Sequence, residues 1–134
     1  MLLFPCNQFL SQEPKQPTPT LTRRLSKDSL SIEGAHSNIA GLMSMVNVNG
    51  KGASPVYDFL KYNSSLYSEG KGEASPIPWN FAKFLVDPNG GGVFGYYSPK
   101  DPLAKVTADI DLLLSGQAPP SQARAPTVAP PTAT

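Results

Sequence analysis

The sequence has few of the residues that cross-link small proteins. Its 134 residues include one cysteine, Cys6, and one histidine, His36. A single cysteine cannot form a disulfide within the chain, and this pair leaves no Cys/His set for a structural zinc site. No apolar run approaches the roughly 20 residues that a helix needs to span a bilayer. We therefore expect no metal site and no transmembrane segment.

The sequence also lacks any long run of charge of one sign. It has 11 Lys and Arg against 10 Asp and Glu, a net charge of +1, and the two signs are interleaved. The only adjacent basic residues are Arg23 and Arg24. An exposed loop accounts for such a pair, so nothing in the sequence indicates a nucleic-acid partner.

Prolines are abundant and clustered. Many of the 15 prolines fall within residues 14–19 and 119–131. They exclude regular structure there, because proline lacks an amide donor and has a fixed φ. Residues 117–134 have no large apolar cluster, so we expect a disordered Pro/Ala/Thr-rich tail. The length allows one domain, which we place at residues 1–116.

The N-terminal part shows one clear element. Residues 2–4 are apolar and stopped by Pro5, which is typical of the end of a buried parallel strand. The polar residues that follow, among them Gln12, should lie at the carboxyl edge of a sheet, where open α/β folds bind ligands. Beyond the prolines we predict only a short helix near residues 22–30, followed by a loop at 34–38.

The middle of the chain predicts a strand, a turn and a helix. Residues 42–48 read as a strand that a turn at 49–52 closes. Ser54-Pro55 is a typical helix start, because serine caps well and proline fits the first helical position. Spacing at i, i+3 and i+4 predicts one buried stripe, formed by Val56, Phe59 and Leu60. Residues 63–75 are rich in glycine and serine, so we expect a loop.

The C-terminal part predicts a hairpin and a second helix. Residues 81–86 and 93–97 are strands joined by a turn at 87–90. Asp101-Pro102 repeats the helix start, and Gly116 is a plausible stop. Strands and helices therefore alternate on a small sheet, which indicates the α/β class.

Three segments carry motifs that occur together in one family. They are Leu3-Phe4-Pro5-Cys6-Asn7-Gln8-Phe9 with Gln12-Glu13-Pro14, then Val48-Asn49-Gly50 with Pro55-Val56-Tyr57 and Phe59-Leu60-Lys61, and finally Trp79-Asn80-Phe81 with Lys83-Phe84-Leu85-Val86-Asp87. Together and in this order they resemble the glutathione peroxidase family over residues 1–14 and about 42–114. Tyr97 and Asp109-Ile110 also fit that family.

The resemblance implies a thioredoxin-like fold and a thiol peroxidase that reduces hydrogen peroxide and organic or lipid hydroperoxides. In this family a peroxidatic cysteine or selenocysteine is assisted by a glutamine, a tryptophan and an asparagine. The matching positions here are Gln12, Trp79 and Asn80. Amide and indole N–H groups donate without carrying negative charge, so they can stabilise an ionised sulfur or selenium. The resemblance implies no cofactor, with glutathione or thioredoxin as the reducing co-substrate.

Taken singly, these residues have plainer interpretations. Trp79 could be a core or loop aromatic, Asn80 a turn or cap residue, and Gln12 a solvated loop side chain. Cys6 is the only thiol, but a cysteine at this motif position is usually not the peroxidatic one in the family. Since it follows an apolar strand end, we expect a small buried residue.

The chain departs from the family's pattern in three places. The family motif Asn-Val-Ala-Ser, then cysteine or selenocysteine, then glycine occurs nowhere in the sequence. We therefore expect the N-terminal catalytic strand, the first helix and the nucleophile to be absent; one hypothesis is a gene model that read a selenocysteine codon as a stop. Residues 15–41 form a divergent insert. Leu10 stands where the family usually has glycine.

These departures narrow the expected function. Residues 15–41 hold no resolving cysteine, which favours glutathione over thioredoxin, and the short loop between Lys61 and Trp79 favours a monomer. We expect an antioxidant oxidoreductase of the oxidative stress response, placed in the cytoplasm, whose 134 residues alone are inactive. The alternative is a non-catalytic thioredoxin-fold fragment or binding module. Cysteine or selenocysteine as the nucleophile, and the preferred hydroperoxide, stay open.

Overall fold

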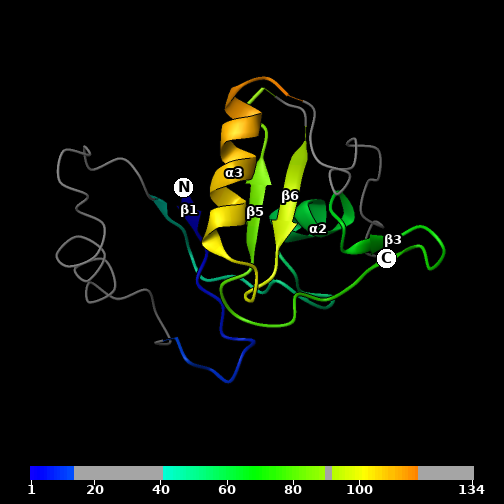
Figure 1. The fold of residues 1–134 in the computed structure, drawn as a ribbon. Coiled ribbons are helices and arrows are strands. Elements are labelled where there is room, and N and C mark those ends of the chain that lie inside the picture. The colour runs from blue at the N-terminus through cyan, green and yellow to red at the C-terminus, as the bar shows by residue number, and fades with distance from the viewer. Residues whose placement is uncertain (14–40, 90–91, 118–134) are drawn as a thin grey trace, which may run out of the picture. The chain divides into compact units, whose positions relative to one another are not determined.

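The computed structural model describes residues 1–13, 41–89 and 92–117 (Figure 1). The chain divides into two compact units, residues 1–47 and 48–134, and each is described by itself. Helices and strands are mixed, as the α/β prediction requires, but the described strands form three separate two-stranded sheets instead of one small sheet. Several expectations lie outside the described residues: the short helix near 22–30, the loop at 34–38, nearly all of the insert at 15–41 and the tail from 118 onwards.

The first unit contains a short parallel strand pair. Strand β1 (Leu2–Leu3) pairs with β2 (Gly41–Leu42), Leu2 opposite Gly41 and Leu3 opposite Leu42. The predicted strand at 42–48 is therefore wrong in extent, because β2 ends at Leu42. Two single hydrogen bonds continue the pairing, from Met43 N to Leu3 O at 2.8 Å and from Val46 N to Pro5 O at 3.0 Å. Pro5 has no N–H to donate in return, so the ladder stops.

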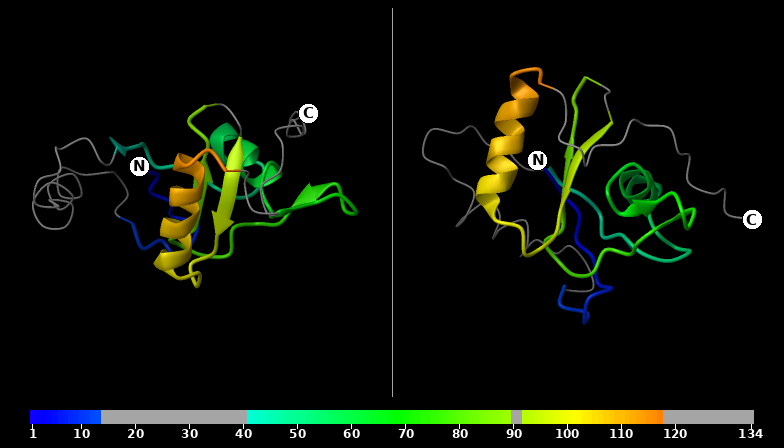
Figure 2. Two further views of the ribbon diagram at one scale, coloured as in Figure 1. Left: turned by 45° about the horizontal axis from the view of Figure 1, so that its top comes forward. Right: turned by 45° about the vertical axis from the view of Figure 1, so that its right-hand side comes forward.

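The second unit is built on the antiparallel hairpin of β5 (Lys83–Val86) and β6 (Val93–Tyr97). Helix α3 (Leu103–Leu114) lies on one side of this hairpin and helix α2 (Pro55–Tyr62) on the other (Figure 2). Side chains at alternate positions of a strand point to opposite faces. Phe84 and Tyr96 thus face the α2 side, where the Tyr57 ring meets Phe84 edge-on at 6.2 Å.

Strand β6 is the most deeply buried element of this unit. Val93, Phe94 and Tyr97 are 1%, 3% and 1% exposed, so β6 is covered on both faces. The turn before it is closed by Asp87 N donating to Gly92 O at 2.9 Å. The predicted hairpin is confirmed, with one difference. β5 begins at Lys83 rather than at residue 81, because Phe81 adopts a left-handed backbone with φ 65° that no strand can include.

Helix α2 begins as predicted, with Pro55 in its first turn and Ser54 at the N-cap. Of the predicted buried stripe, Leu60 is confirmed, and Val56 and Phe59 are wrong. Val56 and Phe59 are 46% and 38% exposed, whereas Leu60 is buried and Tyr57 packs on the hairpin. Lys61 is buried too, with its Nζ 3.5 Å from Asp58 Oδ1. The helix period was right, but its phase depends on the sheet that the helix meets.

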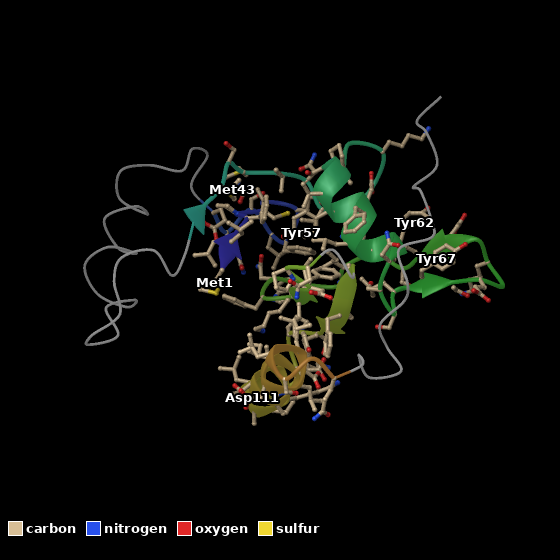
Figure 3. The ribbon with its side chains drawn as sticks, turned by 90° about the horizontal axis from the view of Figure 1, so that it is seen from above. Met1, Met43, Tyr57, Tyr62, Tyr67 and Asp111 are labelled. Atoms are coloured by element: carbon tan, nitrogen blue, oxygen red, sulfur yellow. The ribbon has the colours of Figure 1, made fainter. Side chains whose placement is uncertain are left out.

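The segment expected to be a loop at 63–75 contains a second hairpin. Strand β3 (Tyr67–Ser68) pairs antiparallel with β4 (Glu73–Ala74). Tyr62, the last residue of α2, lies beside Tyr67 with ring centroids 5.4 Å apart (Figure 3). Strands of two residues leave too little alternation to be detected in a sequence rich in glycine and serine.

Helix α3 is fixed at both ends. Asp101 precedes it and accepts a hydrogen bond from Ser98 N at 2.6 Å on Oδ2, and its bonds with Ser98 hold the pKa of Asp101 below its usual value. At the other end Gly116 has φ 72°, Gly116 N donates to Leu113 O, and Gln117 N donates to Leu112 O. This is a Schellman motif, and it confirms the predicted stop at Gly116.

None of the described helices could cross a membrane, because none is both long and apolar enough.

Tyr97 joins α3 to the hairpin. Its hydroxyl donates to Asp109 Oδ2 at 2.8 Å, and Lys105 Nζ lies 5.7 Å from the centre of its ring. Burial and the neighbouring Asp109 carboxylate raise the pKa of Tyr97, so the hydroxyl keeps its proton and remains a donor. The ring lies across Gly95, where an added Cβ would stand 2.7 Å from the Tyr97 hydroxyl oxygen.

We predict that Gly95→Ala destabilises the chain by about 1–3 kcal/mol, because the tethered Tyr97 ring cannot move aside to make room. Gly70→Ala is the matched control, since a Cβ at Gly70 meets nothing within 4 Å. Urea unfolding followed by circular dichroism measures both changes. Equal effects of the two substitutions would contradict the close packing of Tyr97 on Gly95.

Candidate functional site

Trp79 and Asn80 lie together in a turn immediately before β5. Trp79 is 41% exposed and Asn80 is half-buried. Phe81 follows with φ 65° and is 80% exposed. A left-handed backbone is costly for an aromatic residue, so the chain turns sharply here at some expense. The turn presents an indole N–H and a side-chain amide next to one another in the sequence, outside the buried core.

The stretch before this turn is held by Asn49. Asn49 Nδ2 donates to the carbonyl oxygen of Ile77 at 2.9 Å, and Ile77 N donates to Asn49 Oδ1 at 2.9 Å. One side-chain amide thus satisfies both backbone groups of a residue 28 positions away. Val48 and Ile77 are each 3% exposed, so both sides of this contact are anchored by burial.

The other side of the turn is held by Lys83. Its ammonium group donates to the carbonyl oxygen of Phe81 at 2.7 Å. Charged donors make stronger hydrogen bonds than neutral ones, although exposure to water weakens this one. Trp79 and Asn80 therefore lie between two tethered residues, Ile77 and Phe81.

Gln12 lies in the first unit, at the end of a tight loop. Asn7 Oδ1 accepts a hydrogen bond from Glu13 N at 2.8 Å, which closes the loop across six residues. Leu10 and Ser11 both have left-handed backbones, with φ 59° and 49°. The Gln12 side chain is exposed. A polar loop after β1 was expected, and the structure has it.

Cys6 is buried beneath this loop, as its position after an apolar strand end suggested. It is 8% exposed, and Phe9 is equally buried. The Cys6 sulfur accepts a hydrogen bond from Gln8 N at 3.5 Å, and its thiol contacts Gln8 Oε1 at 3.7 Å. The sulfur is thus engaged by local groups and shielded from solvent.

The structure brings Trp79 and Asn80 into one turn and places Gln12 in the other unit. Each unit is defined by itself, so the convergence of all three residues on one pocket stays a prediction. Within residues 1–13, 41–89 and 92–117, no group of three or more His, Cys, Asp and Glu side chains could hold a metal ion.

Sequence reasoning missed Asn49 and Lys83. The sequence indicated Asn49 only as part of a turn and of a family motif, although its two hydrogen bonds to Ile77 hold the segment that precedes Trp79. One signal was available. In Pro76-Ile77-Pro78 only Ile77 has a backbone N–H, and a buried lone donor requires a partner.

Chemically, the turn offers neutral donors. An indole N–H donates only, and the asparagine amide supplies two further N–H groups. Donors held in place can stabilise negative charge that develops on a bound atom. Neither side chain can attack a substrate or form a covalent intermediate, so chemically these two residues can assist a nucleophile but cannot supply one.

Comparison with known proteins decides the family. No family model matches the chain. However, it is 46% identical over 99 residues to Glutathione peroxidase 1, mitochondrial, of Chlamydomonas reinhardtii. The chain belongs to the glutathione peroxidase family. It is also 39% identical over 114 residues to Glutathione peroxidase 1 of Helianthus annuus.

These alignments cover most of this chain but only part of each relative. They span 74% and 85% of the chain, against 42% of the Chlamydomonas and 60% of the Helianthus protein. The crystal structure of Trgpx in apo form is also similar, with a TM-score of 0.54 and 27% identity over 88% of this chain and 58% of that one. The thioredoxin-like fold of the glutathione peroxidases is thereby confirmed.

We predict that Leu10→Gly stabilises the loop that carries Gln12, by up to about 1 kcal/mol, because glycine adopts a positive φ without steric cost. Leu10→Ala is the matched control: it also removes the exposed leucine side chain but keeps the Cβ, so it should have little effect. Hydrogen exchange at the Glu13 amide, whose bond to Asn7 closes the loop, reports local stability. Slower exchange in the alanine variant than in the glycine variant would contradict backbone strain at Leu10.

Proposed function

We propose that the protein to which these residues belong reduces hydrogen peroxide and organic or lipid hydroperoxides with a thiol reductant. The observation that carries this proposal is the turn of Trp79 and Asn80, held on one side by Asn49 and on the other by Lys83. Membership of the glutathione peroxidase family supports it, since these are the positions at which the family motif has its assisting donors.

The proposed reaction has two parts. A thiolate or selenolate attacks the outer oxygen of the hydroperoxide, the O–O bond breaks, and the departing alkoxide takes a proton to become an alcohol or water. The nucleophile is left as a sulfenic or selenenic acid. One reductant thiol then condenses with it, with loss of water, to a mixed disulfide or a selenenyl sulfide. A second reductant thiol attacks the sulfur of the first, so the nucleophile is released and the two reductant molecules leave as one disulfide.

Gln12, Trp79 and Asn80 would assist the first part. Their N–H groups would favour the ionised nucleophile before attack and the developing alkoxide as the O–O bond lengthens. Because all three donors are neutral, they add no negative charge that would repel the anion. This role requires Gln12 to approach the other two, which the proposal includes as a testable element.

We further infer that the nucleophile is not among these 134 residues. The only thiol is Cys6, which is buried and hydrogen-bonded within its own loop. The alignments cover at most three fifths of the two relatives described above, which leaves room for the nucleophile elsewhere in such proteins. The chain by itself would then be inactive.

Three further features belong to the same proposal. Glutathione is the favoured reductant, because residues 15–41, where family members that use thioredoxin commonly carry their resolving cysteine, contain no cysteine. A monomer is favoured because the segment between α2 and Trp79 is short. The cytoplasm is the proposed compartment, and the Chlamydomonas relative is named mitochondrial.

A second candidate is a non-catalytic thioredoxin-fold module that binds a partner. The burial of Cys6, the only thiol, favours it for the chain as it stands. The two candidates differ in one outcome: an extended chain with a family nucleophile gains peroxidase activity only if the donors at Gln12, Trp79 and Asn80 are functional.

We predict that the 134-residue chain reduces hydrogen peroxide and cumene hydroperoxide with glutathione no faster than its Cys6→Ser variant. The reason is that donors stabilise charge on a nucleophile but cannot replace it. Coupling of glutathione oxidation to NADPH consumption by glutathione reductase measures the rate. Turnover that disappears specifically with Cys6→Ser would make Cys6 the peroxidatic residue and overturn the proposal.

We predict that extending the chain by a family segment with the cysteine motif restores turnover, and that Trp79→Phe then lowers kcat by about 10²-fold. Phenylalanine keeps an aromatic ring but lacks the indole N–H, and one well-placed donor is typically worth this factor. Phe81→Leu, in the same turn, is the control and should leave kcat unchanged. Equal losses for Trp79→Phe and Phe81→Leu would assign Trp79 a structural role only.

A further inference from the structure

The contact between Asn49 and Ile77 differs from an ordinary loop hydrogen bond. Both polar atoms of one side chain are used, each at 2.9 Å, and both go to the backbone of the same residue. This copies the pairing of two strand residues, with a side-chain amide in place of a peptide group. Two bonds fix both the position and the orientation of the Ile77 peptide groups, which one bond would not do.

In the segment Pro76-Ile77-Pro78, the bond from Ile77 N to Asn49 is the only hydrogen bond that a backbone N–H can donate. Pro76 and Pro78 have no N–H, so Ile77 carries the one donor of these three residues. A residue that precedes proline is also restricted to extended conformations. The peptide bonds are trans, as the described chain contains no cis peptide. The segment is therefore a stiff, extended piece of chain.

Asn49 is itself held in place. It follows Val48, which is 3% exposed, and it opens a turn in which Gly50 has φ 80° and Ala53 N donates to Gly50 O at 3.1 Å. The backbone of Asn49 is therefore held in place on both sides. A stiff segment tethered to a fixed base transmits that position to the residues that follow it.

The residues that follow are Trp79 and Asn80. Trp79 is 41% exposed, so its surroundings include solvent as well as protein. One residue, Pro78, separates it from Ile77. On the other side, Lys83 holds the Phe81 carbonyl at 2.7 Å, but that bond is exposed and competes with water. The partly buried Asn49 contact is the stronger of the two tethers.

The geometry points to Asn49 as a positioning residue that sets the place of Trp79 and Asn80 through Ile77. It does not touch the reacting atoms. The inference rests on the proposed function in one respect, that these two side chains assist peroxide reduction. The positioning itself is a property of the folded chain and can be measured without peroxide.

The chain allows a direct measurement, because Trp79 is its only tryptophan. We expect Asn49→Ala to shift the emission of Trp79 to longer wavelength. We also expect it to raise the acrylamide quenching constant, by up to about two-fold, since the residue is already 41% exposed. Circular dichroism below the unfolding transition verifies that the variant is folded.

Asn63→Ala is the matched control. Asn63 also donates from Nδ2 to a backbone carbonyl at 2.9 Å, that of Phe59 at the end of α2, and it is 1% exposed. This substitution should lower stability without changing the emission of Trp79. An equal shift in both variants would mean general loosening, and no shift in folded Asn49→Ala would mean that Trp79 is placed by other contacts; each result would overturn the inference.

A second measurement needs no substitution. Hydrogen exchange in the unmutated chain should find the Ile77 amide well protected, because its N–H is bound by Asn49 Oδ1. Rapid exchange at Ile77 would show that the tether is open in solution and would overturn the inference even if Asn49→Ala failed to fold.

In the extended, active chain, Asn49→Ala should lower kcat on the order of 10-fold, because a misplaced donor loses most of its effect. Combined with Trp79→Phe it should cause a smaller further loss than it does alone, since one of the two donors that Asn49 positions is already removed. Fully multiplicative losses would contradict that linkage. The extended chain could instead prove inactive while Asn49→Ala still shifts the emission of Trp79 as expected. That result would reject the peroxidase proposal and leave the positioning by Asn49 intact.

Discussion

Pairing of β6 with β5 is the interaction on which the second unit depends. Because β6 is covered on both faces, its backbone groups that face β5 must be bonded to that strand, and Tyr97 on β6 provides the contact for α3. Tyr97 reaches α3 through Asp109 on one side, while Phe84 on β5 receives Tyr57 of α2 on the other. The turn of Trp79 and Asn80 leads directly into β5, so the hairpin also fixes the downstream end of the candidate site.

Local signals were sufficient where local physics decides the structure. Pro55 and Gly116 mark helix boundaries because a fixed φ in the first turn and a left-handed stop involve only neighbouring residues, whereas Ser54 stands at the N-cap without a side-chain cap hydrogen bond. The phase of α2 was predicted wrongly because it depends on which face meets the hairpin. Tyr57 and Lys61 are polar-tipped residues, yet the Tyr57 ring packs on Phe84 of the hairpin and Lys61 is buried, while Val56 remains exposed. Strand β2 was predicted too long because Pro5, on its partner, ends the ladder.

The candidate site divides in the same way. Trp79, Asn80 and Gln12 could be proposed only from the family motifs, because each has a plainer interpretation on its own. Asn49 could not be assigned a role, since its partner Ile77 is 28 residues away and no periodicity links them. The sequence shows the motif Val48-Asn49-Gly50 but not the contact that Asn49 makes. The sequence shows that the Ile77 N–H is isolated between two prolines. It does not show which side chain bonds to it, because that contact exists only in the folded chain.

Backbone strain in the described part of the chain is confined to the neighbourhood of these residues. The non-glycine residues with positive φ there are Leu10, Ser11 and Phe81, which immediately precede Gln12 or follow Asn80. Each strained turn is matched by a side-chain bond to the backbone, from Glu13 N to Asn7 in one case and from Lys83 to Phe81 in the other. Strain of this kind lowers stability, so it persists only where the surrounding structure enforces it. Its result here is that side-chain amides and an indole are presented outside the core on constrained backbone. Donors that are already oriented need not be ordered when charge develops near them, and this is the property that a site for stabilising an anionic sulfur, selenium or oxygen requires.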